Sequence, residues 1–596
     1  MTSFGPPSSV CRPRVLLIGP YDPHCGEYTF LAPPLGVWRL AGVLEAAGCE
    51  ARVFDPNICS GTAPSGGIGG ESAAPSGGIG GGNAVEAELD RVLASPWDVV
   101  GVSTTGMTLR FDLALAHQAR RALPKAVMVA GGMEATFRPE LTFELGPFDL
   151  VGLGEGERPL LELAERLRAG AALTGIAGTA ERTPAGVARH YQSALPQAEM
   201  ADAIAKTPYE RMPYPAYWER LEMAYRVGAL PFKADREARL AEIRSVRLIT
   251  LNYCPMNCTF CSSTNFLHAA QGSIARVGRL DAEECLAMMR RIVAAQPGVR
   301  TVIFQDDIFV FTADARILPL CEAIVAAKRD GSLPADLQFI STNRIDAMTA
   351  ERLAAMRRAG FRVLGFGVES FSENVLREFN KVRIYPYVEK NLALALELGV
   401  TPFLDLILTS PRSTLDDLAT TVRRAYGWVL AGCEVGMYPY VIPFSGAAMA
   451  DDPELAPHTV YRRQEVAGTD VAWDQPVKIL PVDPEVRRAI LAIEAEFEYW
   501  LAELAREVTH MPSRLRSLLW VACATPVLAA AGRRAPRRDE VVRELLDRLP
   551  GLDAAGRKAW YRRLNQQVSP LGPPRGTLRP ASTRTPSGAV HVAVPA

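Results

Sequence analysis

Two stretches of the chain alternate short apolar runs with amphipathic segments of helical length, and this alternation limits the possible folds more than any other feature. In residues 14–165 the runs RVLLIG, EARVFD, DVVGVST and AVMVAGG have strand length, and helical segments such as PLGVWRLAGVLEAAG lie between them. Strands that alternate with helices in this way form a parallel sheet covered on both faces. The first stretch therefore predicts a doubly wound, Rossmann-like α/β domain.

The second stretch begins near residue 246 and repeats the pattern about six times. Its candidate strands are VRLITLN, RTVIFQD, LQFIST, RVLGFGVE, TPFLDLIL and EVGMYPYVIP, with helices such as AEECLAMMRRIVAAQ between them. Six β/α units predict a partial TIM-type (β/α)6 barrel. In both kinds of parallel sheet, ligands bind at the carboxyl ends of the strands.

Amino-acid composition and Gly- and Pro-rich segments predict the remaining domain boundaries. The segment APSGGIGG occurs twice, at residues 63 and 74, and such a Gly/Ser-rich stretch predicts a flexible insertion. A phosphate-binding glycine loop is the alternative, but the stretch lacks the lysine of that motif. We expect a cofactor-binding domain over residues 1–170 with the insertion at 60–83, a linker over 171–243, the barrel over 244–450, a mostly helical domain over 451–567 and a disordered tail over 568–596.

Charge and hydropathy exclude several classes of protein. The formal net charge is -1, which offers no field for nucleic acid. The start of the chain lacks the layout of a secretory signal, and the longest late apolar run, residues 518–532, is too short to span a bilayer. We therefore expect a cytoplasmic monomer, with no membrane partner, whose eleven cysteines are thiols or metal ligands.

Three of these cysteines, Cys254, Cys258 and Cys261, lie close together in CPMNCTFC, directly after the strand VRLITLN. From the cysteine content, chance would produce this spacing about 0.004 times in such a chain. Thiolates in a short loop suit an iron–sulfur cluster or zinc. Zinc would need a fourth ligand, which His268 could supply.

The C-x-x-x-C-x-aromatic-C pattern, with Phe260 in the aromatic place, resembles the signature of the radical S-adenosylmethionine (radical SAM) superfamily. The resemblance implies a [4Fe-4S] cluster whose fourth iron binds SAM and whose electron cleaves it. It also implies SAM contacts from later strand ends: Gln305, Asp306 and Asp307 for the amino group, Glu369 and Ser370 for the ribose, and Ile407 for the adenine. A solvated acidic turn at residues 305–307 and a salt bridge of Glu369 within the barrel are the alternatives.

The amino-terminal strand ends resemble those of the cobalamin-binding domain in cobalamin-dependent radical SAM enzymes. The matching strings are DVVGVSTT, VMVAGGMEAT and DLVGLGEGE, and the residues implied to line the cobalamin are Ser103, Thr104, Gly131, Gly132, Gly154 and Glu155. His24, in DPHCGE, resembles a cobalt-ligating histidine, and a loop residue that hydrogen-bonds corrin or backbone is the alternative. Arg110 is a further candidate for the cobalt face.

Together these resemblances imply a methyltransferase that moves a methyl group from SAM, through methylcobalamin, to a carbon of a small-molecule or peptide natural-product precursor, an aromatic carbon such as that of tryptophan included. A flavodoxin or ferredoxin would supply electrons. A cyclase, ring-contraction or oxygen-insertion enzyme with the same cofactors is the alternative, and a cobalamin-binding sensor with a structural metal site is a remote one. Six tyrosines predict either an aromatic substrate surface or interdomain packing: Tyr209, Tyr214, Tyr217, Tyr225, Tyr438 and Tyr440.

Overall fold

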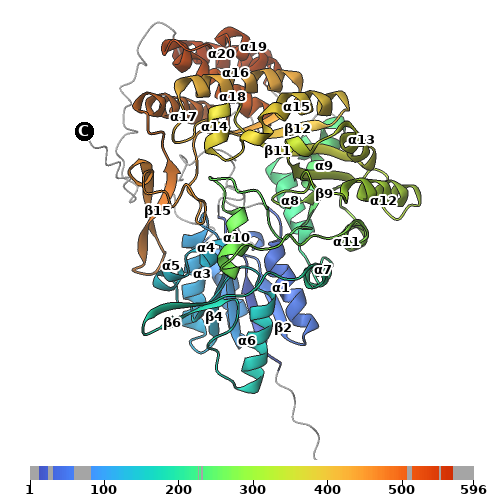
Figure 1. Ribbon diagram of the computed structural model, residues 1–596, viewed down its shortest axis with the longest axis vertical. Helices are drawn as coiled ribbons and strands as arrows, with labels where there is room; N and C mark the ends of the chain where they lie inside the picture. The colour runs from blue at the N-terminus through green and yellow to red at the C-terminus, as the bar shows by residue number, and fades with distance from the viewer. Residues whose placement is uncertain are drawn as a thin grey trace, which may run out of the picture.

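The computed structural model describes residues 12–23, 31–59, 82–225, 227–229, 233–505, 513–549 and 552–567. His24, most of the Gly-rich insertion and the tail lie outside these ranges, so the predictions for them stay predictions. Figure 1 shows the amino-terminal domain below, the barrel above it and the carboxyl-terminal helices at the top.

The amino-terminal sheet has seven strands in the order β2-β1-β3-β4-β5-β6-β7, and the first five are parallel. The strands are β1 Arg14–Ile18, β2 Glu50–Phe54, β3 Val99–Thr104, β4 Val127–Gly132, β5 Leu150–Gly152, β6 Thr179–Thr183 and β7 Gly186–His190. The helices of this domain are α1 Leu35–Ala46, α2 Gly82–Leu93, α3 Leu109–Ala122, α4 Met133–Phe137, α5 Pro139–Leu145 and α6 Glu157–Ala169.

Each face of this sheet buries its own core. Leu16 and Ile18 of β1 pack with α2 and α3, whereas Val15 and Leu17 pack with α1 and α6 on the opposite face. Because successive strand residues point to opposite faces, both faces of β1 must be apolar when helices cover both. The predicted doubly wound domain is confirmed.

The predicted linker over residues 171–243 is wrong in its first part, because β6 and β7 form a hairpin that pairs antiparallel with β5. These strands are short and half-polar, so their alternation of apolar and polar residues is weak. They form because the edge of the sheet offers backbone hydrogen-bond partners, which the sequence pattern does not reveal. The rest of the segment forms α7 Gln197–Ala205, α8 Tyr214–Ala224 and α9 Lys233–Ile243.

The second sheet has six parallel strands in the order β13-β12-β11-β10-β9-β8, as the partial barrel requires. They are β8 Ser245–Leu248, β9 Thr301–Phe304, β10 Gln338–Asn343, β11 Phe361–Glu369, β12 Thr401–Ile407 and β13 Glu434–Tyr438. The connecting helices are α10 Ser263–Gln271, α11 Ala282–Ala295, α12 Ile317–Arg329, α13 Ala350–Ala359, α14 Glu373–Glu378, α15 Val388–Glu397 and α16 Leu415–Ala431.

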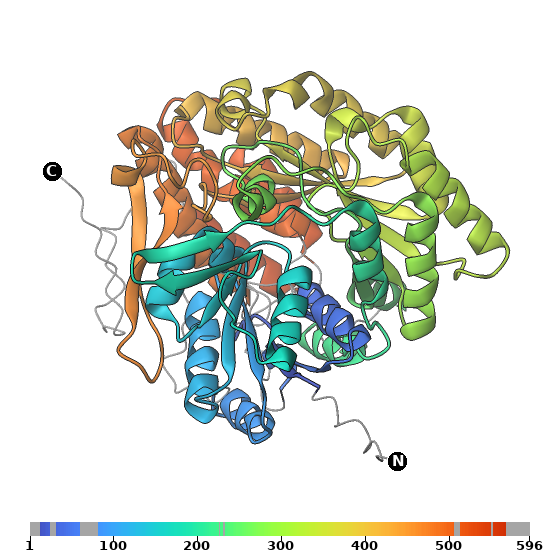
Figure 2. The same cartoon turned by 60° about the horizontal axis from the view of Figure 1, so that its bottom comes forward.

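The carboxyl-terminal region, predicted to be mostly helical over residues 451–567, begins with an antiparallel hairpin and continues as helices. The hairpin strands are β14 Thr459–Glu465 and β15 Ala472–Ile479, and the helices are α17 Pro484–Ala505, α18 Ser513–Ala530, α19 Arg538–Arg548 and α20 Ala554–Gln567. Val466 and Trp473, near the tip of the hairpin, pack into the core of the amino-terminal domain, so the hairpin extends from the carboxyl-terminal helices to that domain (Figure 2). No helix among the described residues is long and apolar enough to cross a membrane.

The tyrosines divide between packing and an open surface. Tyr209, Tyr214 and Tyr217 are almost fully buried where the linker helices meet the rest of the protein. The Tyr217 hydroxyl donates to Asp55 at 2.8 Å, which ties α8 to the end of β2. Tyr438, at the carboxyl end of β13, keeps 50% of its side chain exposed. Interdomain packing therefore accounts for the first three, and Tyr438 faces open space.

Candidate active site between the two sheets

The three-cysteine loop follows β8 and is held at both ends. At its start, the Asp306 carboxylate accepts hydrogen bonds from the Thr250 and Leu251 backbones at 2.6 and 2.8 Å. Farther along, the Thr259 backbone donates to the Phe379 carbonyl at 3.3 Å, and the Cys261 backbone donates to the Cys258 carbonyl at 3.2 Å. These hydrogen bonds fix the shape of the loop at its start and near its end.

The three thiols lie close enough to influence one another's pKa. Burial raises the pKa of Cys254 to about 12, and Asp307, Cys261 and Cys258 add to the shift. Burial also raises the pKa of Cys258, and Lys381 opposes it. Since the thiolate is the ligand form, the charge of a bound metal centre would have to stabilise it here.

No three His, Cys, Asp or Glu side chains in the described ranges converge on a point suited to one ion. Ligands of a cluster bind separate iron atoms and need not converge on one point. The chemistry of three thiols in one loop at a strand end suits such a cluster. His268, the candidate fourth ligand for zinc, lies on α10, with its ring 5.5 Å from that of Tyr253.

Next to the loop, the end of β11 carries a buried ion pair. Lys381 Nζ lies 2.8 Å from Glu369 Oε1 and also donates to the Gly367 carbonyl at 2.6 Å. Glu369 has a φ of +62°, a strained conformation for a residue other than glycine, which is common at functional sites. A Cβ on Gly367 would lie 2.6 Å from the Glu369 carboxylate, so only glycine leaves room for the pair.

Apolar residues complete this side of the loop. The Phe260 ring lies 4.8 Å from that of Phe379, and both contact a cluster that includes Ile407. The structure thus brings together three of the predicted SAM residues, namely Glu369, Phe260 and Ile407, from three separate segments.

The other predicted SAM residues occupy different environments. The Asp307 side chain is exposed beside the loop, yet partial desolvation by the surrounding protein raises its pKa, and a hydrogen bond with the Ser263 side chain opposes the shift. Gln305 accepts a hydrogen bond from Arg247 and faces the interdomain cavity instead. Asp306 and Ser370 are buried, and the Ser370 hydroxyl is bonded to Thr421 at 2.9 Å. The Asp306 carboxylate and the Ser370 hydroxyl therefore stabilise the fold around the site through hydrogen bonds within the protein.

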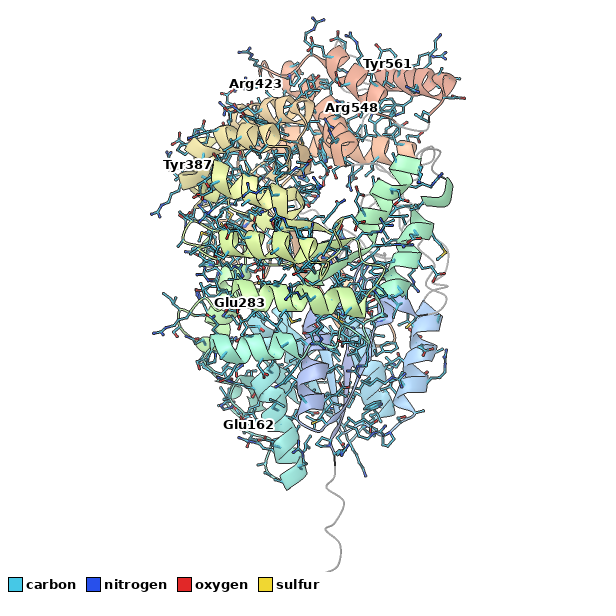
Figure 3. The ribbon with its side chains drawn as sticks, turned by 90° about the vertical axis from the view of Figure 1, so that its right-hand side faces the viewer. Glu162, Glu283, Tyr387, Arg423, Arg548 and Tyr561 are labelled. Carbon is cyan, nitrogen blue, oxygen red and sulfur yellow. The ribbon has the colours of Figure 1, made fainter. Side chains whose placement is uncertain are left out.

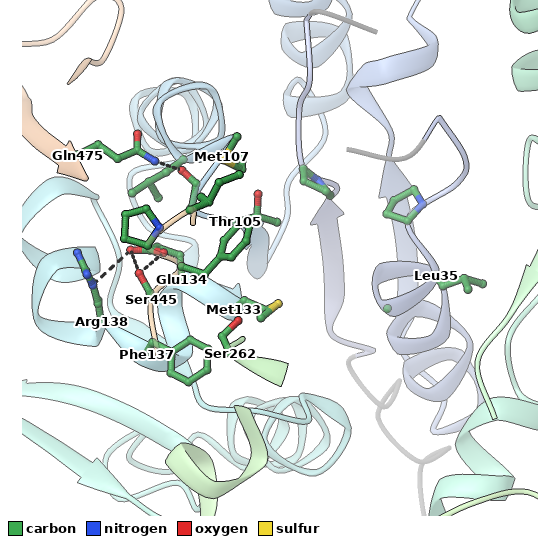
Figure 4. A pocket seen from close by; sticks show the side chains of 18 of the residues that line it. Leu35, Thr105, Met107, Met133, Glu134, Phe137, Arg138, Ser262, Ser445 and Gln475 are labelled. Carbon is green, nitrogen blue, oxygen red and sulfur yellow. Dashed lines mark hydrogen bonds and ion pairs between the residues drawn. The ribbon is translucent and has the colours of Figure 1, made fainter. Parts of the chain in front are cut away.

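A cavity of about 640 Å³ lies between the strand ends of the two domains. Its walls are largely apolar, and two large side chains that stay partly exposed, Met133 at 39% and Phe444 at 42%, line it from different domains. Exposed apolar side chains gathered in a cavity indicate a ligand with an apolar surface. Ser262, the residue after Cys261, also lines it, so the cysteine loop reaches this cavity (Figure 4).

Polar contacts fix the cavity walls across the domain boundary. The Ser445 hydroxyl donates to Glu134 at 2.9 Å, and Glu134 also pairs with Arg138 at 3.9 Å (Figure 4). On another wall, Gln475 of β15 donates to the Gly106 carbonyl. These contacts hold the two domains at a fixed separation around the space.

A second cavity, of about 360 Å³, continues from the first between the ends of β1, β3, β4 and β5. It is lined by five of the predicted cobalamin residues: Ser103, Gly131, Gly132, Gly154 and Glu155. Thr104 is fully buried and its hydroxyl donates to the Gly131 carbonyl at 3.0 Å, so it supports this wall from behind. A cavity that penetrates the sheet from a larger apolar space fits the nucleotide tail and corrin of cobalamin.

Two of these glycines are needed for backbone reasons. Gly132 has a φ of +96°, and a Cβ there would lie 2.4 Å from the Thr104 carbonyl oxygen. Gly154 has a φ of +71°, and its Cβ would lie 2.5 Å from that of Ala270 on α10. Gly131 differs, since a Cβ there would meet no atom within 4 Å. Only Gly131 therefore leaves open space that a ligand can fill.

Sequence reasoning missed several side chains at this site. Lys381, Asp405, Met133 and Phe444 carry no motif, and their importance follows only from what they face. Burial raises the pKa of Asp405 to about 7, Glu369 adds to the shift, and Lys381 opposes it. Arg110, predicted for the cobalt face, lines a third cavity beside the large one.

The fold and these cavities define a class of protein: a radical SAM barrel with an added cobalamin-binding domain. The Radical SAM superfamily model matches residues 248–425, and the B12 binding domain model matches residues 23–164. Residues 248–425 are therefore a radical SAM domain, and residues 23–164 are a B12-binding domain. The protein's cofactors are a [4Fe-4S] cluster, SAM and cobalamin.

Individual relatives share this arrangement. An uncharacterized methyltransferase, PH0819, of Pyrococcus horikoshii is 26% identical over 55% of this chain and 64% of its own length. Cytidylyl-2-hydroxyethylphosphonate methyltransferase of Streptomyces wedmorensis is 26% identical over 63% of this chain and 69% of its own. The chain thus spans about two thirds of these curated relatives.

Two solved structures have the same fold over nearly the whole chain. The radical SAM methyltransferase TsrM of Kitasatospora setae, with cobalamin and a [4Fe-4S] cluster bound, is 16% identical over 93% of this chain and all of that one, with a TM-score of 0.57. The cobalamin-dependent radical SAM enzyme OxsB, with aqua-cobalamin and SAM bound, is 14% identical over 94% of this chain and 84% of that one, with a TM-score of 0.58. The predicted fold class is confirmed.

Proposed function

We propose that the protein is a cobalamin-dependent radical SAM methyltransferase that transfers a methyl group from SAM to a carbon of a small-molecule or peptide substrate. One observation carries this proposal: Ser262, next to Cys261, lines the cavity that fits the corrin. The SAM side and the corrin side of the site are therefore neighbours, as two centres acting on one substrate must be.

The chain's own residues divide the work of binding. Cys254, Cys258 and Cys261 hold the cluster, and Asp307 is the acid placed to pair with the ammonium group of SAM. Glu369, oriented by Lys381, is placed to accept hydrogen bonds from the ribose, and Ile407 with Phe260 offers an apolar surface to the adenine. When bound, cobalamin supplies the methyl group and the cluster supplies the electron that cleaves SAM.

The names of the relatives support methyl transfer as the reaction. Two curated relatives are methyltransferases, and the TsrM structure was also solved with tryptophan as substrate and a SAM analogue. We infer a natural-product precursor as the substrate, an aromatic carbon included. The cluster needs one electron at a time from outside, and a flavodoxin or ferredoxin is the donor we propose.

The test is anaerobic reconstitution with iron, sulfide and cobalamin, followed by turnover with SAM carrying a CD3 group. We expect a candidate substrate to carry a CD3 group in place of one hydrogen atom, together with formation of S-adenosylhomocysteine. Cys258→Ala should abolish this transfer, whereas Cys285→Ala, which removes a buried thiol outside the loop, should retain it. A product without the label, such as a ring-contracted or oxidised one, would overturn the proposal.

A further inference from the structure

A third cavity, of about 290 Å³, opens beside the large one. We call it the hairpin cavity: it lies between the end of β13, the β14–β15 hairpin and helices α17 and α18. It shares Met107, Ile442, Gln475 and Pro476 with the cavity of about 640 Å³ between the two domains, which we call the corrin cavity, so the two spaces adjoin. A molecule in the hairpin cavity would lie against the corrin cavity and at the barrel's working face.

The hairpin cavity contains a cation that the described residues leave without a counter-charge. Arg516 of α18 lines it half-buried and makes no hydrogen bond or salt bridge with any part of the chain that the structure describes. Burial lowers the pKa of Arg516, and Tyr438 opposes this. A guanidinium withdrawn from water without a partner is costly, so an anionic ligand would relieve the cost.

Two neighbouring cations each have a partner within the chain. Lys478 in the same cavity pairs with Glu494 at 3.4 Å and donates to the Tyr440 hydroxyl at 2.9 Å. Arg514, two residues before Arg516 on the same helix, donates to the Val429 carbonyl at 2.9 Å. Arg516 differs from both, since it lines the cavity and its five N–H donors have no hydrogen-bond partner among the described residues.

Aromatic rings form the wall next to Arg516. Phe497 and Trp520 stack with centroids 3.9 Å apart and an interplanar angle of 12°. Tyr438, half-exposed, stands at the end of β13 and reaches the same space. A cation beside flat apolar surfaces suits a ligand with an oxyanion attached to a planar or apolar body.

The hairpin cavity also borders the SAM side of the barrel. Tyr438, which lines the cavity, pairs in register across β12 and β13 with Ile407, the residue that we assign to the adenine of SAM. Tyr438 therefore stands between the hairpin cavity and the strand ends that we assign to SAM. A molecule held there has one face toward SAM and one toward the corrin cavity.

We propose that the hairpin cavity is the substrate site and that Arg516 binds an oxyanion of the substrate, a carboxylate or a phosphate, while the substrate's planar or apolar body packs on Tyr438 and the Phe497–Trp520 stack. This inference rests on the proposed function, and it names the class of substrate. Arg516 is a binding residue in this assignment, and the hairpin and α18 are the elements that select the substrate.

The test measures binding of three probes with one body, 2-naphthoate, 2-naphthamide and 2-naphthyl phosphate, to the reconstituted holoenzyme by calorimetry. We expect an anionic probe to bind and Arg516→Met to weaken it at least about tenfold, with Arg516→Lys intermediate. The stronger anionic probe identifies carboxylate or phosphate. Arg548→Met removes an exposed arginine of α19 and should bind as the unaltered protein does (Figure 3).

Iron and cobalamin contents of each variant show whether it is folded, and the lysine variant keeps the test valid if the methionine variant is not. The proposal is overturned if no anionic probe binds, if the amide binds equally well, or if Arg516→Met and Arg548→Met bind alike. Methyl transfer is measured separately. Arg516-dependent binding in a protein that transfers no methyl group would contradict the proposed function and leave this site standing.

Discussion

The two sheets present their carboxyl ends to one set of cavities, but they do so with different chemistry. The amino-terminal sheet offers backbone and small residues, among them Gly131 and Gly132, and the barrel offers sulfur and charge, among them Cys258 and the Glu369–Lys381 pair. A large, partly apolar cofactor is recognised through shape, whereas a small charged one is recognised through individual side chains. The barrel edge should therefore be far more sensitive to side-chain changes than the other edge.

The largest expected effect is the loss of the cluster from Cys258→Ala. Removal of one of three ligands should abolish the iron–sulfur absorbance and the cleavage of SAM, because no neighbouring donor can replace a thiolate. Cobalamin binding should persist, since it depends on the other sheet. Cys285→Ala is the matched control and should keep the cluster. Loss of cobalamin together with iron in Cys258→Ala would show that the two edges are not independent.

The second effect concerns the buried pair at the end of β11. Burial alone would lower the pKa of Lys381, but Glu369 and Cys258 raise it overall, so the ammonium is held charged. Lys381→Met leaves the Glu369 carboxylate uncompensated and should cost about 3 kcal/mol in the free energy of unfolding. SAM binding should weaken in parallel, measured by calorimetry.

A matched surface pair provides the control for this prediction. Arg377 and Glu373 lie 2.8 Å apart on α14, and both are largely exposed. Arg377→Met should change the unfolding free energy by less than about 1 kcal/mol. The double variant with Lys381→Met and Glu369→Gln should recover part of the lost stability. Equal losses from Lys381→Met and Arg377→Met would contradict the role of burial.

The third effect separates backbone from ligand contacts at the amino-terminal edge. Gly132→Ala should cost about 1–3 kcal/mol of stability, because its φ is positive and its Cβ would approach the Thr104 carbonyl to 2.4 Å. Gly131→Ala should leave stability unchanged and lower cobalamin affinity, because its Cβ would enter the cavity. The measurements are thermal unfolding without cobalamin and cobalamin titration. Equal changes in stability and in cobalamin affinity for the two variants would contradict the division between a backbone role for Gly132 and a ligand contact for Gly131.

The sequence predicted the two sheets because their strand and helix periods are regular and long. It predicted the three cysteines because their spacing is improbable by chance. It missed the β6–β7 hairpin, whose half-polar strands depend on a neighbouring edge, and it could not show that the Asp306 carboxylate and the Ser370 hydroxyl bond to Thr250 and Thr421 of the protein itself. Pairing between distant segments, such as Glu369 with Lys381 or Arg516 with its cavity, has no local pattern and requires the folded chain.

The smallest expected effect is a pH dependence at Asp55, a buried acid at the amino-terminal edge that bonds to Tyr217 rather than to a ligand. Burial raises its pKa to about 6 from 3.8, while the Tyr217 hydroxyl and Asn57 oppose the shift. A raised acid pKa means that the folded state binds the proton more tightly than the unfolded state does. Asp55 thus adds stability as pH falls from about 7 toward 4, and this contribution disappears above about 6.

Between pH 7 and pH 5 the Asp55 contribution should grow by about 1 kcal/mol. Asp55→Asn cannot titrate, and its amide oxygen can still accept the Tyr217 hydrogen bond. The stability of the unaltered protein relative to Asp55→Asn should therefore be higher at pH 5 than at pH 7 by that amount, measured by chemical unfolding at both values. A relative stability that is constant or that moves the other way would mean that Asp55 is charged in the folded protein, and the amino-terminal edge would then resemble the barrel edge in holding buried charge.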